Sequence, residues 1–280
     1  MFALKSSSSS SNLTSSGLRW NAKTKRSSMR GHGHGLCVRA SASQVAPPQQ
    51  TQPQQRRARK GVPQGTPERE QCVQSLPDRP RRNRKSAVLR EAIRETAPIL
   101  PANLIYPLFV YDHIQEPDTE KEIASMPGVK RHSIPELVAE VGDALRYGVK
   151  QVVIFPKTPD SLKTRLGEES ANPEGLAQTA IRELKKAYGD EVFVHTDVAL
   201  DPYNTDGHDG IVDDVTGRVL NDETVAMLCA QAVSQAQAGA DCVAPSDMMD
   251  GRIGAIRQAL DENGFEHVSI MSYCAKYASK

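Results

Sequence analysis

The run Val192-Phe193-Val194-His195-Thr196-Asp197 decides the fold, because it has strand length, is mainly apolar and ends in a carboxylate. After a polar loop, an amphipathic helical pattern begins with Asn221 as its cap and ends at Gly239. The next apolar run, residues 242–245, again has strand length. A strand, a helix and a second strand in this order predict a βαβ unit with parallel strands.

The same alternation extends in both directions from this unit. Further apolar runs predict strands at residues 104–110, 152–155 and 268–273. The helical patterns that separate these strands each end at a glycine and cover residues 133–148, 173–189 and 253–264. The first of these helices begins with the S-x-x-E capping box of Ser133 and Glu136. Residues 211–219 are expected to form a hairpin.

A Rossmann sheet and a TIM barrel both have this strand and helix order. The first strand is not followed by G-x-G-x-x-G, and GxxxxGK[ST] does not occur, so the usual phosphate cradles are missing. Polar residues instead follow the strand ends, namely Asp197, Asp201, Ser246, Asp247 and Lys276. Because that edge is the active face of a TIM barrel, we predict an α/β TIM (β/α)8 barrel, with about the first five strands present in this chain.

The N-terminal part has a different composition. Residues 1–67 contain no Asp or Glu and are rich in Ser and basic residues, so residues 1–40 are predicted to be a chloroplast transit peptide. Low-complexity disorder is the alternative. The Gln- and Pro-rich residues 41–78 are predicted to be a disordered linker. Residues 79–102, which begin with a basic run, are expected to form an arm that packs on this chain or on a neighbouring subunit, and residues 103–280 form the partial barrel domain.

The overall composition argues against two classes of partner, nucleic acids and membranes. A net charge of +1 over 280 residues gives no reason to expect nucleic acid, and no apolar run is long enough to span a membrane. The basic residues of the arm are not interleaved with aromatic ones, so bases would have no stacking platform. The five cysteines are scattered, which argues against a disulfide framework and against a thiolate zinc site.

Two groups of residues could carry chemistry. Lys276 follows a predicted strand among aromatic and small residues, and desolvation there would lower its pKa and free the amine to form a Schiff base. An ordinary solvated lysine is the alternative. Asp197, Asp201, Asp206 and Asp209 crowd one loop with His208, and such carboxylates suit a hard cation such as Mg²⁺. A polar loop held by Asx turns is the alternative there.

Four long segments of the chain resemble the 5-aminolevulinate dehydratase (porphobilinogen synthase) family. They are residues 103–110, 197–210, 244–252 and 271–279. The resemblance implies a TIM barrel with an N-terminal arm, usually assembled as a homo-octamer. It also implies condensation of two 5-aminolevulinate molecules to porphobilinogen in the chloroplast stroma, as part of heme and chlorophyll synthesis.

The resemblance also implies roles for individual residues. Lys276 matches the first of two Schiff-base lysines, and Asp197 matches an acidic, substrate-binding residue of the active-site floor. Zinc-using members have three cysteines where this chain has Ala199, Asp201 and Asp209, so Mg²⁺ rather than Zn²⁺ is expected as the metal, with Asp201 and Asp209 as its ligands. His208, which is kept, is expected to be structural.

The chain also departs from the family in length. The second lysine and the carboxylate-binding residues of the family fall after Lys280, so we expect this truncated chain alone to be inactive. One alternative function is that of a non-catalytic fragment that binds full-length subunits. Another is a different Schiff-base barrel enzyme, such as an aldolase, although the Asp-rich loop and residues 244–252 argue against it.

Overall fold

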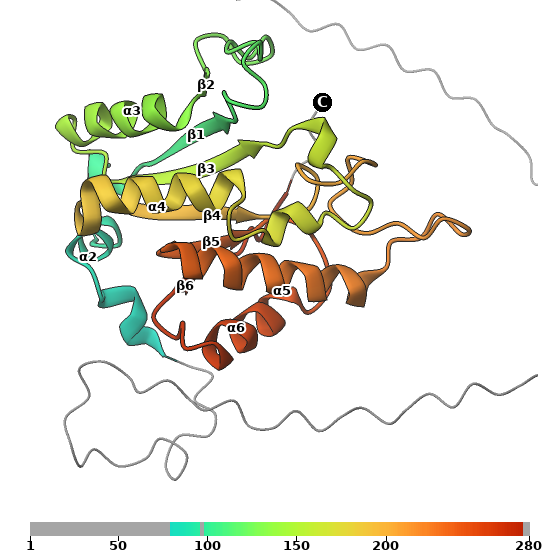
Figure 1. Ribbon diagram of the computed structural model, residues 1–280. Coiled ribbons are helices and arrows are strands. Elements are labelled where there is room, and N and C mark those ends of the chain that lie inside the picture. Colours follow the sequence, from blue (N-terminus) through green and yellow to red (C-terminus); the bar gives the residue numbers. More distant parts are fainter. Residues whose placement is uncertain (1–78, 96–97, 277–280) are drawn as a thin grey trace, which may run out of the picture. The chain divides into compact units, whose positions relative to one another are not determined.

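The computed structural model describes residues 79–95 and 98–276 (Figure 1). The predicted transit peptide and the whole of the predicted linker lie outside the described residues. Among the described residues, no helix is both long enough and apolar enough to cross a membrane.

One parallel sheet organises the described residues. Its strand order is β2-β1-β3-β4-β5-β6, and every neighbouring pair is parallel. The strands are β1 (Ile105–Tyr111), β2 (Arg131–His132), β3 (Gln151–Lys157), β4 (Phe193–Val198), β5 (Cys242–Pro245) and β6 (Ser269–Ile270). All five predicted strands are present, although β6 is much shorter than predicted, and the two-residue β2 was not predicted.

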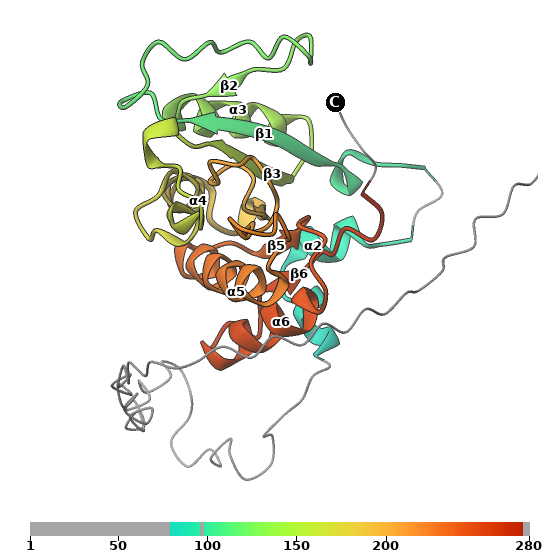
Figure 2. The same cartoon turned by 90° about the vertical axis from the view of Figure 1, so that its right-hand side faces the viewer.

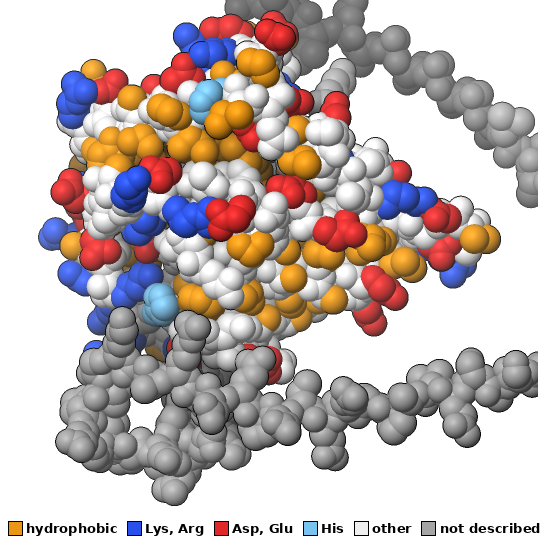
Figure 3. All heavy atoms as spheres, viewed as in Figure 1, with side chains coloured by type: hydrophobic (Ala, Val, Ile, Leu, Met, Phe, Trp, Pro, Cys, Tyr) orange, Lys and Arg blue, Asp and Glu red, His pale blue; other side chains and the backbone are white. Residues whose placement is uncertain are grey.

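Helices cover the outer face of this sheet, as Figures 1 and 2 show. The α-helices are α2 (Ala87–Ala92), α3 (Ile134–Arg146), α4 (Leu176–Tyr188), α5 (Asn221–Ala238) and α6 (Arg252–Glu262). The short 3₁₀ helices are η1 (Pro80–Arg84), η2 (Pro101–Asn103), η3 (Asp160–Leu162), η4 (Glu168–Ala171) and η5 (Gly189–Glu191). Acidic and basic side chains are interspersed over this helical face in Figure 3.

The predicted helix ends are largely confirmed. The Ser133 backbone N–H and hydroxyl each donate to Glu136 Oε2 at 2.9 Å, which is the predicted capping box. Gly239 ends α5 in the left-handed region, with φ of 112°. The predicted hairpin is also present, because Val212 and Val219 form an antiparallel bridge.

Two predicted helix starts were wrong by one to three residues. Helix α4 begins at Leu176 rather than at Pro173, because the Asn172 side chain accepts from the Glu174 N–H and holds a turn there. Asn221 is the first residue of α5 and not its cap. Its side-chain oxygen instead accepts from the Asp250 N–H at 2.8 Å, so it joins α5 to the loop that precedes α6.

Two apolar clusters fill the space between sheet and helices. One packs β1, β3 and β4 against α3 and α4, with Leu137, Ile154 and Leu184 at its centre. The other packs β4 and β5 against α5 and α6 around Leu228 and Ile256. All five of these side chains are at most 2% exposed. The strand side chains that face the helices thus hold the sheet against them. The strand side chains on the opposite face of the sheet are free for other roles.

The first described part of the predicted arm packs on this same chain. Val88 and Leu89 of α2 form a small apolar cluster with Phe193 and Cys242, which begin β4 and β5. Lys85 forms an ion pair with Asp241 at 3.3 Å, next to that cluster. The arm therefore covers the amino ends of the strands, opposite the edge at which chemistry was predicted.

Candidate functional site

The carboxyl ends of the strands, marked by the arrowheads in Figure 1, surround a hollow of about 450 Å³. Charged side chains of both signs line it. The acidic side chains are Asp197 and Asp201, which lie at and after β4. The basic side chains are Arg131, Lys157, Lys163 and Lys276. Three of the four site residues predicted from sequence, Asp197, Asp201 and Lys276, therefore line one cavity although Lys276 lies far from the other two in the chain.

Asp197 is the most perturbed carboxyl group of this hollow. It follows Thr196 on β4 and accepts a hydrogen bond from the Ser246 hydroxyl at 2.7 Å. Burial raises the pKa of Asp197 to about 7, and the Asp201 carboxylate adds to this while the Ser246 hydrogen bond and the Lys276 charge oppose it. A carboxyl group with this pKa can accept and return a proton near neutral pH.

Lys276 lies beside Asp197 and is held by two contacts. Its Nζ donates to Asp209 Oδ2 at 2.8 Å and to the Ser246 carbonyl oxygen at 2.8 Å. The side chain is 35% exposed, so it is less desolvated than the sequence predicted. An ion pair and a backbone carbonyl, rather than an apolar surrounding, fix this amine at the mouth of the hollow.

The Asp-rich loop brings Asp201 and Asp209 together at the same edge. Partial burial and the neighbouring Asp209 carboxylate both raise the pKa of Asp201. His208 Nδ1 accepts from the Gly210 N–H at 2.9 Å, an interaction that shapes the loop locally, as expected for a structural residue. Ala199 is buried, with 1% exposure.

The donors in this loop fit a hard cation better than a thiolate metal. Asp201 and Asp209 supply only carboxylate oxygens, and the described cysteines 229, 242 and 274 are not in the loop. Within residues 79–95 and 98–276, no group of three or more His, Cys, Asp or Glu residues is arranged to hold a metal. Mg²⁺ is usually bound through one or two carboxylates and keeps several waters, so two carboxylates are a sufficient protein contribution.

Helix α5 positions the end of β4, which sequence reasoning missed. Gln235 accepts from the Thr196 hydroxyl at 2.7 Å and donates to the Asp197 carbonyl oxygen at 2.8 Å. Gln235 is 1% exposed, so both contacts are shielded from water. A glutamine on the buried side of an amphipathic helix is the signal that could have identified it.

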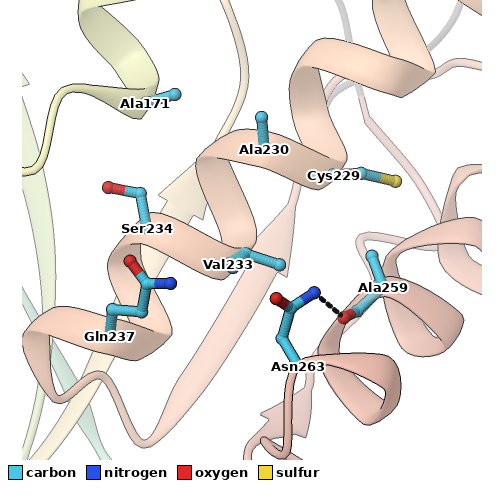
Figure 4. A pocket seen from close by; sticks show the side chains of 8 residues that line it. All are labelled: Ala171, Cys229, Ala230, Val233, Ser234, Gln237, Ala259 and Asn263. Carbon is cyan, nitrogen blue, oxygen red and sulfur yellow. Dashed lines mark hydrogen bonds between the residues drawn. The ribbon is translucent and has the colours of Figure 1, made fainter. Parts of the chain in front are cut away.

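A second hollow lies on the outer surface, between α5 and α6 (Figure 4). Small and uncharged side chains line it, among them Ala230, Val233 and Asn263. The Asn263 amide there only donates to the Ala259 carbonyl oxygen at 2.8 Å. This hollow has no ionisable pair comparable to that of Lys276 and Asp209, so the strand edge is the better candidate for chemistry.

Known proteins are similar to this chain over most of its length. The family model described as delta-aminolevulinic acid dehydratase matches residues 77–280. This chain belongs to the delta-aminolevulinic acid dehydratase family. It is 57% identical over 222 residues to the chloroplastic delta-aminolevulinic acid dehydratase of Chlamydomonas reinhardtii, which covers 79% of this chain and 55% of that protein. It is 58% identical over 226 residues to the Glycine max enzyme of the same name, covering 80% and 52%.

A solved structure of the family shares the fold. The delta-aminolevulinic acid dehydratase (porphobilinogen synthase) of Toxoplasma gondii, in complex with the reaction product porphobilinogen, matches with a TM-score of 0.61 at 50% identity. The match covers 72% of this chain and 56% of that one. It confirms the predicted TIM-barrel class. This chain spans about half the length of the curated relatives it matches.

Proposed function

We propose that this chain takes part in the condensation of two 5-aminolevulinate molecules to porphobilinogen, with loss of two waters. The observation that supports this most is the position of Lys276, whose amine lies 2.8 Å from both Asp209 and the Ser246 carbonyl at a hollow that also contains Asp197. An amine beside a carboxyl group with a pKa of about 7 suits Schiff-base chemistry on a ketone.

The proposed step is attack of Lys276 on the substrate ketone. The ammonium gives its proton to a neighbouring carboxylate, and the nitrogen lone pair forms a bond to the carbonyl carbon. The carbon–oxygen π electrons move to oxygen, which is protonated and leaves as water when the imine forms. Asp197 is the group that can return the proton at neutral pH, because its pKa is raised to about 7. The substrate amine is bound by Asp197.

Family members depend on a metal ion. In this chain Asp201 and Asp209 would hold Mg²⁺ rather than Zn²⁺, because both are oxygen ligands. When bound there, the ion would supply positive charge that favours the ionised carboxylates and orients polar substrate groups. Asp209 would then contact the ion instead of Lys276. Metal binding would thus release the Lys276 amine from its ion pair.

We place the reaction in the chloroplast stroma, with residues 1–40 as the transit peptide, because the relatives from Chlamydomonas and Glycine are named chloroplastic. Assembly into a homo-octamer through the arm is a further part of the proposal. Size-exclusion chromatography with light scattering would measure that mass, and a monomer at all concentrations would contradict it.

Borohydride trapping with 5-aminolevulinate tests the proposed function. Reduction of the imine should leave a stable secondary amine on the peptide that contains Lys276, detected by mass spectrometry. Lys276→Arg should abolish the adduct, whereas Lys130→Arg, which changes an exposed lysine paired with Glu122, should leave it unchanged. No adduct on Lys276 in a folded chain, under conditions that trap a full-length relative, would refute the assignment.

A further inference from the structure

Asp209, which holds the Lys276 amine, lies in the long loop between β4 and α5 and not on a strand. Its place beside the amine therefore depends on what holds that loop. We propose that Arg165 is a positioning residue for the reaction, because it fixes the loop on both sides of Asp209. This inference rests on the proposed function, in which Lys276 is the nucleophile, and adds the residue that keeps its carboxylate partner in reach.

The Arg165 guanidinium contacts the Asp-rich loop at three points. Its Nη2 donates to the Val212 carbonyl oxygen at 3.1 Å and to Asp206 Oδ2 at 3.4 Å. Its Nη1 forms an ion pair with Asp214 Oδ1. Asp206 precedes Asp209 in the chain, whereas Val212 and Asp214 follow it. One side chain thus spans the segment that carries Asp209.

The backbone around Arg165 is joined to the beginning of the same loop. Thr164 and Asn204 form a parallel bridge, in which the Thr164 N–H donates to the Tyr203 carbonyl oxygen at 3.2 Å and the Thr205 N–H donates to the Thr164 carbonyl oxygen at 3.0 Å. The Asn204 side-chain amide donates to the Arg165 carbonyl oxygen at 3.1 Å. These contacts fix the backbone from which the guanidinium extends, so less conformational entropy is lost when the side chain binds the loop.

The loop needs a cation because it is strongly acidic. Five aspartates lie within residues 201–214, namely Asp201, Asp206, Asp209, Asp213 and Asp214. Their negative charges repel one another. Arg165 is 47% exposed, and a single ion pair at such a site would contribute little. A planar guanidinium shared by two carboxylates and a carbonyl oxygen forms a network, which is the arrangement in which exposed charges do stabilise a structure.

Arg165 does not itself line the hollow, so it can act on the reaction only through the loop. At the other end of the loop segment, Asp209 Oδ2 lies 2.8 Å from Lys276 Nζ and is one of the carboxylates that can take the ammonium proton. A loop released from Arg165 would present this carboxylate less often. Loss of Arg165 should therefore slow imine formation without changing how tightly the ketone is bound.

Timed trapping of 5-aminolevulinate in the full chain tests this role. Samples are quenched with borohydride at successive times, and mass spectrometry of the Lys276 adduct gives the rate of imine formation and the half-saturating concentration. Arg165→Met should lower the rate at saturation about tenfold and leave the half-saturating concentration unchanged. In an Asp209→Asn background, Arg165→Met should have no further effect, because the two residues act through one contact.

Arg218→Met is the matched control. It removes the same charge from an exposed side chain of the hairpin that follows Asp209. The Arg218 carbonyl oxygen accepts from the Asp213 N–H at 2.8 Å, and this backbone contact remains in the variant. Both trapping constants should equal those of the wild type. Amide hydrogen exchange should be faster at residues 206–214 in Arg165→Met and unchanged in β3 and β4, which would show that the chain is still folded.

The outcomes separate this inference from the proposed function. A wild-type rate in Arg165→Met, an equal loss in Arg218→Met, or a further loss in the Asp209→Asn background overturns the positioning role alone. If the wild type traps no 5-aminolevulinate on Lys276, the proposed function fails and this inference with it.

Discussion

Replacement of Asp197 by Asn should remove a pH dependence from the stability of the protein. The pKa of the carboxyl is raised from 3.8 to about 7 by burial, so the folded state holds a proton that the unfolded state has released between these values. An acidic group whose pKa is higher in the folded state than in the unfolded state stabilises the folded state at low pH. This stabilisation is lost as the pH rises from about 4 to about 7. From pH 5 to pH 8, the loss amounts to about 2–3 kcal/mol of unfolding free energy.

Urea denaturation of the wild type and of Asp197→Asn at pH 5 and pH 8 measures this difference. The Asn side chain can still accept from the Ser246 hydroxyl, so the variant keeps the 2.7 Å contact while losing the titration. Asp213→Asn is the matched control, because hydrogen bonds from Thr216 and Val215 lower the pKa of Asp213. This substitution should therefore change the unfolding free energy by the same amount at both pH values. If the wild type and Asp197→Asn change equally between pH 5 and pH 8, the raised pKa is refuted.

Three further predictions concern the rest of the structure. Asp241→Asn should lower the unfolding free energy measured in urea by about 1–3 kcal/mol, because the side chain is 11% exposed and pairs with two lysines at 3.3 and 3.0 Å. Gly210→Ala should lower the unfolding free energy by about 1–3 kcal/mol, because an added Cβ would lie 2.7 Å from a side-chain atom of Val219. At Gly254 an added Cβ would have no atom within 4 Å, so Gly254→Ala should stabilise α6 by up to about 1 kcal/mol. Asp209→Asn should weaken Mg²⁺ binding in calorimetry, and unchanged affinity would exclude it as a ligand.

Much of the fold follows from local patterns in the sequence. The capping box at Ser133 and the glycine after α5 have the same physical cause in any helix, so they can be recognised without tertiary contacts. Strand β2 was missed because Arg131 and His132 have no apolar pattern, and only pairing with β1 makes them a strand. The sixth strand is short for a related reason, because Ser269 and Ile270 pair with β5 while the residues after them continue as irregular chain.

The candidate site was harder to predict, because its contacts join distant parts of the chain. The sequence identified Lys276 and Asp209 separately, but not that they form an ion pair across 67 residues. It gave no sign that Thr158 has a buried hydroxyl, because a threonine after a strand is usually solvated or bonded to the backbone. Residues with ordinary local preferences thus acquire a function only when the sheet brings their strands together.

An unpartnered polar atom is not enough to mark a site, because Arg79 and Arg82 also leave buried nitrogens without a described partner. What distinguishes the carboxyl edge is that several costly features occur together. Asp197 has a strongly raised pKa, Thr158 lines the hollow and has a buried hydroxyl without a described partner, and Met248 adopts φ of 72° in the loop after β5. Each feature destabilises the folded chain, and a stability cost repeated at one edge of a sheet is typical of residues kept for binding or chemistry.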